Sequence, residues 1–269
     1  MKIVVCVKQV PATSDAKIDP QTKRIVREGS RSILNPFDLY ALEEAIRVRE
    51  RVGGEVIALS MGPESAKNVL TEALSMGADR AVLLCDRAFA GSDTWATSYA
   101  LARAIDTIGG VDLVFCGKQA VDGDTAQVGA GIAAKLDMLQ ATNVSKIEAL
   151  EADAVTVTRM NERGWDVVRL RYPALLTVIK DINVPRVPLL RDARAARRAT
   201  IPLLKPEDIG AEPDKIGLRN SPTQVVRTAP PATRSAAAIK LDGAPAQIAE
   251  ALFSLLKDRG LLQTGGDEA

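Results

Sequence analysis

Four short apolar runs, set apart by helical patterns, constrain the fold of this chain more than any other feature. They are KIVVCV (2–7), EVIALS (55–60), RAVLLC (80–85) and VDLVFC (111–116). Continuous apolar runs of this length are typical of parallel strands that are covered on both faces. Since strands and amphipathic helices alternate through short loops, the sequence predicts an α/β fold with a doubly wound, mostly parallel sheet.

Helix boundaries in the first half of the chain follow from residues with known preferences at helix ends. Between the first two strands, Asn35 fits the N-cap position, Pro36 the first helical position and Gly53 the C-terminal stop. A second helix is expected to begin near Pro63 and to end at Gly77.

The pattern changes in the second half of the chain. The segment AVTVTRMNERGWDVVRLRYPALLTVI (154–179) predicts an antiparallel hairpin that turns at Arg163 and Gly164, followed by an apolar strand. We expect these strands to extend the sheet along one edge. The sequence thus predicts a first domain over residues 1–183, with an α/β fold.

Residues beyond 183 have a different composition. Prolines recur around the Arg-rich stretch RDARAARR, which predicts a C-terminal arm over 184–228 with no core of its own. Residues 229–269 form a C-terminal extension. Within it, residues 244–262 predict an amphipathic helix whose apolar face docks on another surface.

Composition excludes several classes of function. The chain has no histidine, which excludes Ser-His-Asp and Cys-His catalysis and also the usual zinc and haem sites. Cys6, Cys85 and Cys116 lie in apolar runs without a CxxC motif, so we expect buried, reduced thiols and no metal. The 35 basic and 34 acidic residues give no general attraction to nucleic acid.

The sequence also carries no targeting signal that we can identify. Its N-terminus MKIVVCVKQV becomes polar too soon for a signal peptide, and no apolar run is long enough to span a membrane. We therefore expect a cytoplasmic protein with no membrane insertion.

Two polar loops follow predicted strands and lead into helices. They are CDRAFAGSDTWATS (85–98) and CGKQAVDGDTAQVG (116–129). In doubly wound sheets, ligands bind at the carboxyl ends of strands, and helix N-termini bind phosphate. Helix capping uses the same residue types, so either loop by itself leaves both interpretations open. Two such loops, expected on neighbouring strands, favour a nucleotide.

The segment KQAVDGDTAQVG, together with NPFDLYALEEAIRVRE and MGADRA upstream, resembles the beta subunit of electron transfer flavoprotein. The resemblance runs from residue 1 to about residue 228. It implies an adenine nucleotide alpha hydrolase-like fold and an alpha-subunit partner that carries FAD. The beta subunit binds a structural AMP in ordinary members and a second FAD in electron-bifurcating members. DRAFAGSDTWATS is similar to the bifurcating type, so we expect FAD, with AMP as the alternative.

The resemblance also implies site residues in this chain. For partner binding it implies Leu189, Leu190 and Arg191, in a recognition loop that contacts an acyl-CoA dehydrogenase; a solvated basic linker is the alternative. No catalytic residue is implied. The cofactor-binding residues that it implies are Cys6, Asn35, Asp38, Met61, Asp93, Thr94, Thr97, Val121, Asp122, Gly123, Asp124, Thr125, Ala126, Gln127, Val128 and Gly129.

The function implied is electron transfer, in which the chain acts only together with partner subunits. In the bifurcating type, NADH reduces the beta-subunit FAD. One electron then passes to a low-potential acceptor such as ferredoxin or flavodoxin, and the other passes through the alpha-subunit FAD to the dehydrogenase. A non-bifurcating carrier with AMP is the alternative. An ATP-dependent hydrolase or ligase of similar fold would need an SGGxDS-type loop, which CVKQVPATSD lacks.

Overall fold

The structure is a computed structural model that describes residues 1–12, 32–226 and 239–262. The chain divides into two compact units, residues 1–228 and residues 229–269. The first unit holds both sheets and every helix but the last, and it contains all the candidate site residues.

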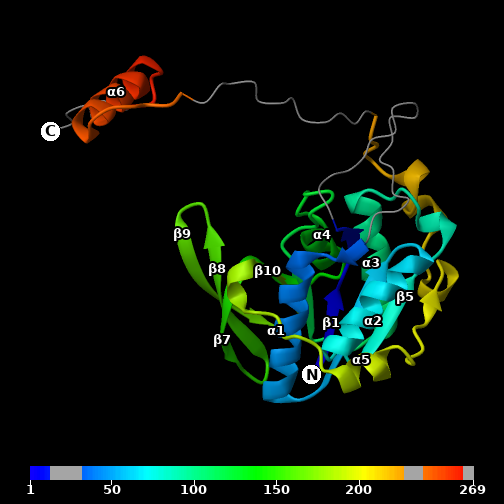
Figure 1. The fold of residues 1–269 in the computed structure, drawn as a ribbon. Helices are drawn as coiled ribbons and strands as arrows, with labels where there is room; N and C mark the ends of the chain where they lie inside the picture. The colour runs from blue at the N-terminus through cyan, green and yellow to red at the C-terminus, as the bar shows by residue number, and fades with distance from the viewer. Residues whose placement is uncertain (13–31, 227–238, 263–269) are drawn as a thin grey trace. The chain divides into compact units, whose positions relative to one another are not determined.

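A nine-stranded sheet forms the centre of the first unit (Figure 1). Its order is β11-β5-β4-β1-β6-β10-β7-β8-β9, parallel from β11 to β7 and antiparallel from β7 to β9. This order confirms the predicted doubly wound, mostly parallel sheet with an antiparallel hairpin at its edge. The strands are β1 (Lys2–Cys6), β4 (Glu55–Met61), β5 (Arg80–Leu84), β6 (Leu113–Gly117), β7 (Leu139–Leu150), β8 (Ala154–Asn161), β9 (Gly164–Arg171), β10 (Ala174–Val178) and β11 (Leu203–Leu204).

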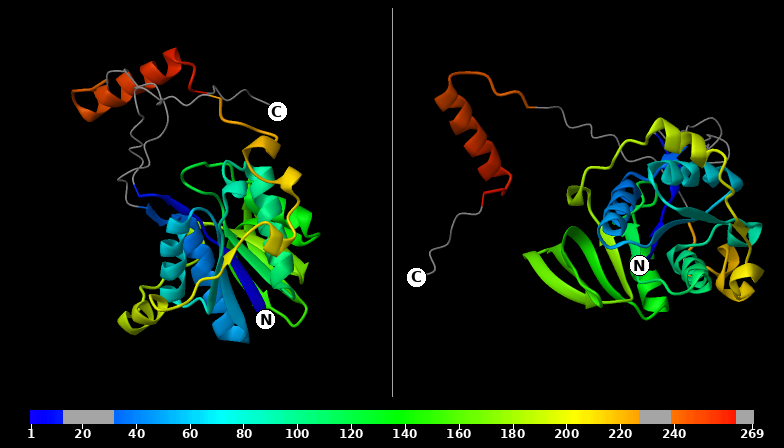
Figure 2. Two further views of the ribbon diagram at one scale, coloured as in Figure 1. Left: turned by 90° about the vertical axis from the view of Figure 1, so that its right-hand side faces the viewer. Right: turned by 90° about the horizontal axis from the view of Figure 1, so that it is seen from below.

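Helices cover both faces of the parallel strands (Figure 2). Alternate residues of β1 point to opposite faces: Ile3 and Val5 pack with the core under α1 and α2, and Val4 packs with the core under α3 and α4. A small antiparallel sheet pairs β2 (Gln9–Pro11) with β3 (Ser32–Leu34). The helices of this unit are α1 (Pro36–Val52), α2 (Lys67–Met76), α3 (Thr94–Ile108), α4 (Val128–Lys135) and α5 (Leu190–Ala196), with short 3-10 turns η1 (Glu64–Ala66), η2 (Arg87–Phe89), η3 (Lys180–Ile182), η4 (Glu207–Ile209), η5 (Pro213–Lys215) and η6 (Leu218–Asn220).

The apolar strand that follows the hairpin lies in a different place from the one we predicted. β10 does not extend the edge of the sheet. It inserts between β6 and β7, where Leu175 pairs with Val114 on one side and with Gln140 on the other. All five of its residues are buried, as a continuous apolar run suggests for a central strand. The prediction also missed β7, which pairs with β8 of the edge hairpin on one side and with β10 on the other.

We expected the two polar loops to follow neighbouring strands, and this prediction was wrong. β4 and β1 separate β5 from β6. The chain adds β4 and β5 on one side of β1 and β6 on the other, so the strand order reverses between β1 and β6, and we call this the point where the sheet changes direction. The loops meet instead through their helices, because α3 and α4 pack closely on one face. A Cβ atom added to Gly131 would lie only 2.6 Å from Oγ of Ser98, so glycine permits this approach.

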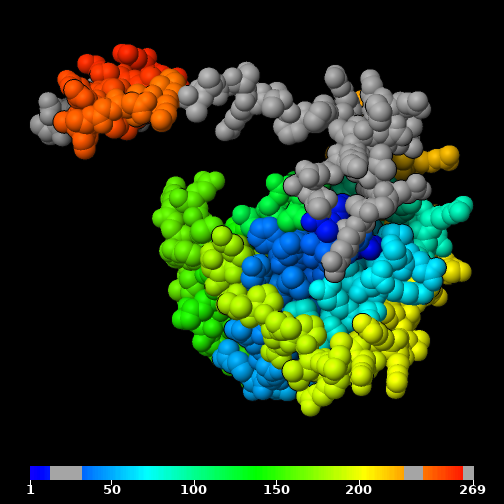
Figure 3. Space-filling model, viewed as in Figure 1, coloured from blue at the N-terminus to red at the C-terminus, as the bar shows by residue number. Residues whose placement is uncertain are grey.

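Residues 184–226 run along the α/β body rather than away from it. α5 packs against α2. In the space-filling view, α5 is yellow-green and α2 is cyan (Figure 3). Further along, β11 adds a parallel strand beside β5, and η4 contacts α3. The start of this segment is tied to α1, because the Arg186 guanidinium bonds the buried carboxylate of Glu43 and also Glu50.

The second unit is described over residues 239–262, and the remainder of the predicted extension lies outside the described residues. It contains α6 (Pro245–Asp258), which confirms the predicted amphipathic helix. None of its residues is buried, and Leu252 and Phe253 are exposed. Its docking on another surface stays a prediction. Among the described helices, none has the length and apolar character needed to cross a membrane.

Candidate functional site

Two buried polar side chains on the first turn of α1 connect the carboxyl ends of β1 and β6. Asn35 is fully buried at the N-cap position, but its side chain makes no capping bond. Its Nδ2 instead donates to the Gln119 carbonyl at 2.9 Å, and its Oδ1 accepts from the Val121 N–H at 3.1 Å. Asn35 therefore holds the start of the 117–129 loop.

Asp38 holds both strand ends. Its Oδ2 accepts from the backbone N–H of Lys8 at 2.8 Å, directly after β1, and the N–H of Gly117 at the end of β6 also bonds its carboxyl group. A Cβ atom at Gly117 would collide with Asp38 Oδ1 and with the backbone of Phe37, so the contact requires glycine. We call Asn35 and Asp38 the strand-end clamp.

Burial sets the protonation of the clamp. Removal from water raises the pKa of Asp38 from 3.8 to about 7, although hydrogen bonds from Asn35, Lys8 and Gly117 act in the opposite direction. Asp38 therefore changes charge near neutral pH, at the point where the sheet changes direction.

The loop held by the clamp lies at the surface. Residues 121–127 are all exposed. Asp124 and Ala126 both have φ of 54°, a left-handed conformation that is costly for a residue with a Cβ atom. Gln127 follows with φ −110° and ψ −23° and does not cap α4. A left-handed residue before a right-handed one turns successive N–H groups to the same side, and in proteins this geometry at a helix start can bind an anion.

Two further polar residues position this loop. Lys8 Nζ forms an ion pair with Asp122 Oδ1 at 2.7 Å, and Gln119 donates a hydrogen bond to Asp124. Sequence reasoning did not single out Lys8 or Gln119. The one available signal was their position, since each follows a strand by two residues, at the edge where the ligand was expected.

The 86–98 loop uses most of its polar groups within the chain. Asp93 Oδ1 caps α3 by accepting from Ala96 N–H at 3.0 Å, and its Oδ2 accepts from Thr223 N–H and Oγ1 at 2.9 and 2.8 Å. Partial burial raises the pKa of Asp93, but these hydrogen bonds outweigh it and leave the pKa lowered. Ser92 bonds Phe89 and Gly217. The hydrogen bonds of Asp93 and Ser92 therefore cap α3 and attach residues 217–223 to the loop.

The remaining predicted cofactor residues lie at or near the same edge of the sheet. Thr94 donates to Gln127 at 3.2 Å and so links the two loops, whereas Thr97 Oγ1 lies 3.5 Å from the Ser92 carbonyl. Met61 ends β4 and is half-buried, and Cys6 ends β1 and is buried. The structure thus gathers the clamp, Thr94 and the 121–129 loop, and it turns Asp93 towards Thr223.

The predicted partner-binding residues lie at another place in the fold. Leu189 and Leu190 are exposed where α5 begins, and the Arg191 side chain is exposed beside them. Just beyond α5, Ala199 and Thr200 lie beside Asp79 and Arg80, at the start of β5. This segment therefore lies at the amino end of the sheet, opposite the candidate site.

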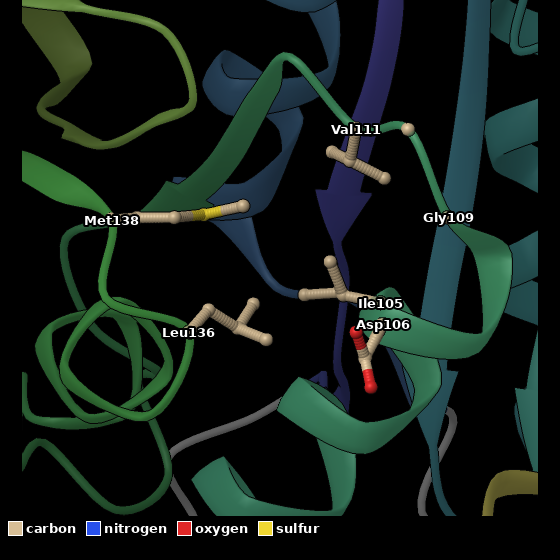
Figure 4. A pocket seen from close by; sticks show the side chains of 7 residues that line it. Ile105, Asp106, Gly109, Val111, Leu136 and Met138 are labelled. Carbon is tan, nitrogen blue, oxygen red and sulfur yellow. The ribbon is translucent and has the colours of Figure 1, made fainter.

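A small hollow also lies at the amino end of the sheet, where α3 and α4 end (Figure 4). It measures about 200 Å³ and is lined mainly by Ile105, Val111, Leu136 and Met138. That volume is below the range typical of ligand pockets. Across the described ranges, no group of three or more acidic or cysteine side chains is placed to hold a metal ion.

Fold and site together define a doubly wound α/β protein whose polar loops meet at the strand ends. The profile of the family described as "Electron transfer flavoprotein domain" matches residues 22–209. The chain is 50% identical to "Electron transfer flavoprotein subunit beta" of Thermoanaerobacterium thermosaccharolyticum, over 89% of this chain and 92% of that protein. The chain therefore belongs to the electron transfer flavoprotein beta-subunit family.

Two other relatives have different names. "Protein FixA" of Azorhizobium caulinodans is 46% identical, over 94% of this chain and 93% of that protein. "Caffeyl-CoA reductase-Etf complex subunit CarD" of Acetobacterium woodii is 44% identical, over 97% of this chain and all of that protein. Both similarities include most of the C-terminal extension, which we had placed outside the resemblance.

The raised pKa of Asp38 predicts a pH dependence of stability. Between pH 3.8 and about 7, the folded chain keeps a proton on Asp38 that the unfolded chain has lost, so stability falls as the pH rises. Asp38→Asn removes this effect. From about pH 5 to about pH 8, the unfolding free energy of the wild type should fall by roughly 2–3 kcal/mol relative to the variant. Urea unfolding at several pH values measures this difference, and a constant difference would contradict the prediction.

Proposed function

We propose that this chain is the beta subunit of a heterodimeric electron transfer flavoprotein of the bifurcating type, and that its strand-end site binds FAD. When bound there, FAD would supply redox chemistry: hydride uptake from NADH, and electron delivery both to a low-potential acceptor such as ferredoxin or flavodoxin and, through the alpha-subunit FAD, to an acyl-CoA dehydrogenase. The residues of this chain bind and orient the cofactor.

The single observation that carries this proposal is the exposed 121–127 loop at the point where the sheet changes direction. Ligands of doubly wound sheets bind at that point, outside the carboxyl ends of the strands. The left-handed Ala126 precedes the right-handed Gln127, and no side chain caps the start of α4, so the backbone N–H groups of residues 126–128 are available to a ligand. Such donors suit the diphosphate of FAD or the phosphate of AMP.

The other residues of the site fit an adenine nucleotide. The buried clamp fixes the loop, so the phosphate-binding donors are positioned before the ligand arrives. Thr94 and Gln127 carry hydroxyl and amide groups that suit ribose or the flavin ring. None of these groups needs to transfer a proton, which agrees with a chain that lacks histidine.

A non-bifurcating carrier that holds a structural AMP is the second candidate. One observation favours it: Asp93 and Ser92, which suggested an FAD-lining loop, are occupied by Thr223, Gly217 and the α3 N-terminus. The FAD proposal gains support from the 44% identity to a subunit named for a caffeyl-CoA reductase–Etf complex. The two candidates share a fold and partners and differ in the ligand.

Cofactor content separates the two candidates. We expect the heterodimer, purified after co-expression with its alpha subunit, to contain two FAD molecules and no AMP. Flavin absorbance after denaturation counts the FAD, and chromatography of the released nucleotides detects AMP. One FAD and one AMP per heterodimer would contradict the bifurcating type and support the AMP-binding carrier.

Leu190 provides a test of the proposed contact with the dehydrogenase. Its side chain is 72% exposed and lies at the opposite end of the sheet from the nucleotide loops. Burying such a side chain on docking contributes roughly 1.5–3 kcal/mol, which corresponds to at least a tenfold change in affinity. Leu190→Ala should therefore slow electron delivery to the dehydrogenase, without changing flavin content or reduction by NADH.

Val167 offers a matched control for this experiment. Its side chain is 67% exposed on β9, away from α5, so Val167→Ala removes a similar apolar surface elsewhere. Steady-state electron transfer is measured over a range of flavoprotein concentrations. Equal effects of the two substitutions, or loss of flavin from the Leu190 variant, would show that Leu190 has no specific role in docking.

A further inference from the structure

Two of the three cysteines lie side by side in the centre of the sheet. Cys6 ends β1, and the register of the parallel β1–β6 pair places it directly opposite Cys116. Neighbouring strands lie about 4.7–4.9 Å apart, within the Cα separation that a disulfide spans. Both cysteines pack on the face of the sheet covered by α3 and α4.

The pair lies directly beneath the candidate site. Cys116 immediately precedes Gly117, and its Cβ lies 3.5 Å from the position that a Cβ of Gly129 would occupy. Both residues are buried, with exposed fractions of 9% for Cys6 and 6% for Cys116, and they lie at the strand ends. We expect small solutes to reach the pair from this side. Cys85, at the end of β5, has no such position beside another cysteine.

We propose that Cys6 and Cys116 form an oxidation-sensitive dithiol that closes to an intramolecular disulfide on reaction with a peroxide. In the first step, the Cys6 sulfur attacks the peroxide, the O–O bond breaks, and Cys6 sulfenic acid and water form. In the second step, the Cys116 sulfur attacks the Cys6 sulfur, the S–S bond forms, and the S–O bond breaks to release a second water. The two thiols lose two protons and two electrons, which reduce one hydrogen peroxide to two waters.

The surroundings set the order of these steps. The neighbouring Cys6 thiol and burial raise the pKa of Cys116, with a further effect from the nearby Asp38. Cys116 therefore stays protonated more strongly than an ordinary thiol, so it acts second, and closure should become faster as the pH rises. The strand register, and not the identity of any ligand, carries this inference. It therefore stands or falls independently of the proposed function.

Mass spectrometry of the purified heterodimer tests the dithiol directly. The protein is treated with hydrogen peroxide, blocked with iodoacetamide and digested without reduction. We expect one peptide pair joined through Cys6 and Cys116, lighter than the two separate peptides by two hydrogen atoms, and restored by dithiothreitol. Cys85→Ser is the matched control and should close as the wild type does, whereas Cys6→Ser should form no disulfide within the chain.

A sample oxidised in urea provides a second control, because unfolding removes the strand register. There, bridges that include Cys85 should form as well. The proposal is wrong if the native protein keeps both thiols free until it is unfolded. It is also wrong if Cys6 proceeds to sulfinic acid without closure, or if native bridges include Cys85.

Discussion

The strand-end clamp determines how the rest of the site is arranged. Asn35 and Asp38 lie one turn apart on α1, yet between them they bond the backbone after β1 and the backbone after β6. Buried polar groups of this kind are costly to leave unpaired, by about 1–3 kcal/mol each, so the two strand ends keep a fixed geometry. The exposed loop that follows β6 depends on this geometry for its direction.

The fold separates two tasks by placing them at opposite ends of one sheet. The polar loops lie at the carboxyl ends of the parallel strands. The segment that carries the exposed Leu189 and Leu190 lies at the amino end, where Ala199 and Thr200 lie beside the start of β5. Residues 203–223 pass between the two ends, since β11 pairs with β5 and Thr223 bonds Asp93. The 184–226 segment therefore helps to shape the candidate site as well as to carry the exposed leucines.

Local patterns predicted most of the elements. The four continuous apolar runs predicted β1, β4, β5 and β6, and the glycines at 53 and 77 predicted the ends of α1 and α2. The order of the strands is a matter of long-range pairing, which no local pattern contains. The sequence therefore did not show that β10 inserts beside β6, or that β5 and β6 lie apart.

Only part of the candidate site was predicted, because its long-range contacts likewise have no local pattern. The glycine-rich loop after β6 was found, because turns and helix starts have local signatures. Asn35 fits the N-cap preference equally well whether it caps α1 or bonds Gln119, so its real partner was not predictable. The bonds from Thr223 to the Asp93 carboxylate were not predictable because Thr223 lies far along the chain, and contact of Asp93 with a ligand stays a prediction. Lys8 was missed because its partner Asp122 is likewise distant in sequence.

The most direct test of the central claim, that the clamp holds a nucleotide-binding loop, is amide hydrogen exchange on the heterodimer. The measurement compares nucleotide-stripped protein with protein saturated with AMP or FAD, for the wild type and for Asn35→Ala. We predict that nucleotide protects the amides of residues 117–129 in the wild type. In the variant, we predict that these amides exchange faster and lose this protection, while those of β9 do not change. Protection confined to other parts of the chain, or full protection of the loop in the variant, would contradict the account.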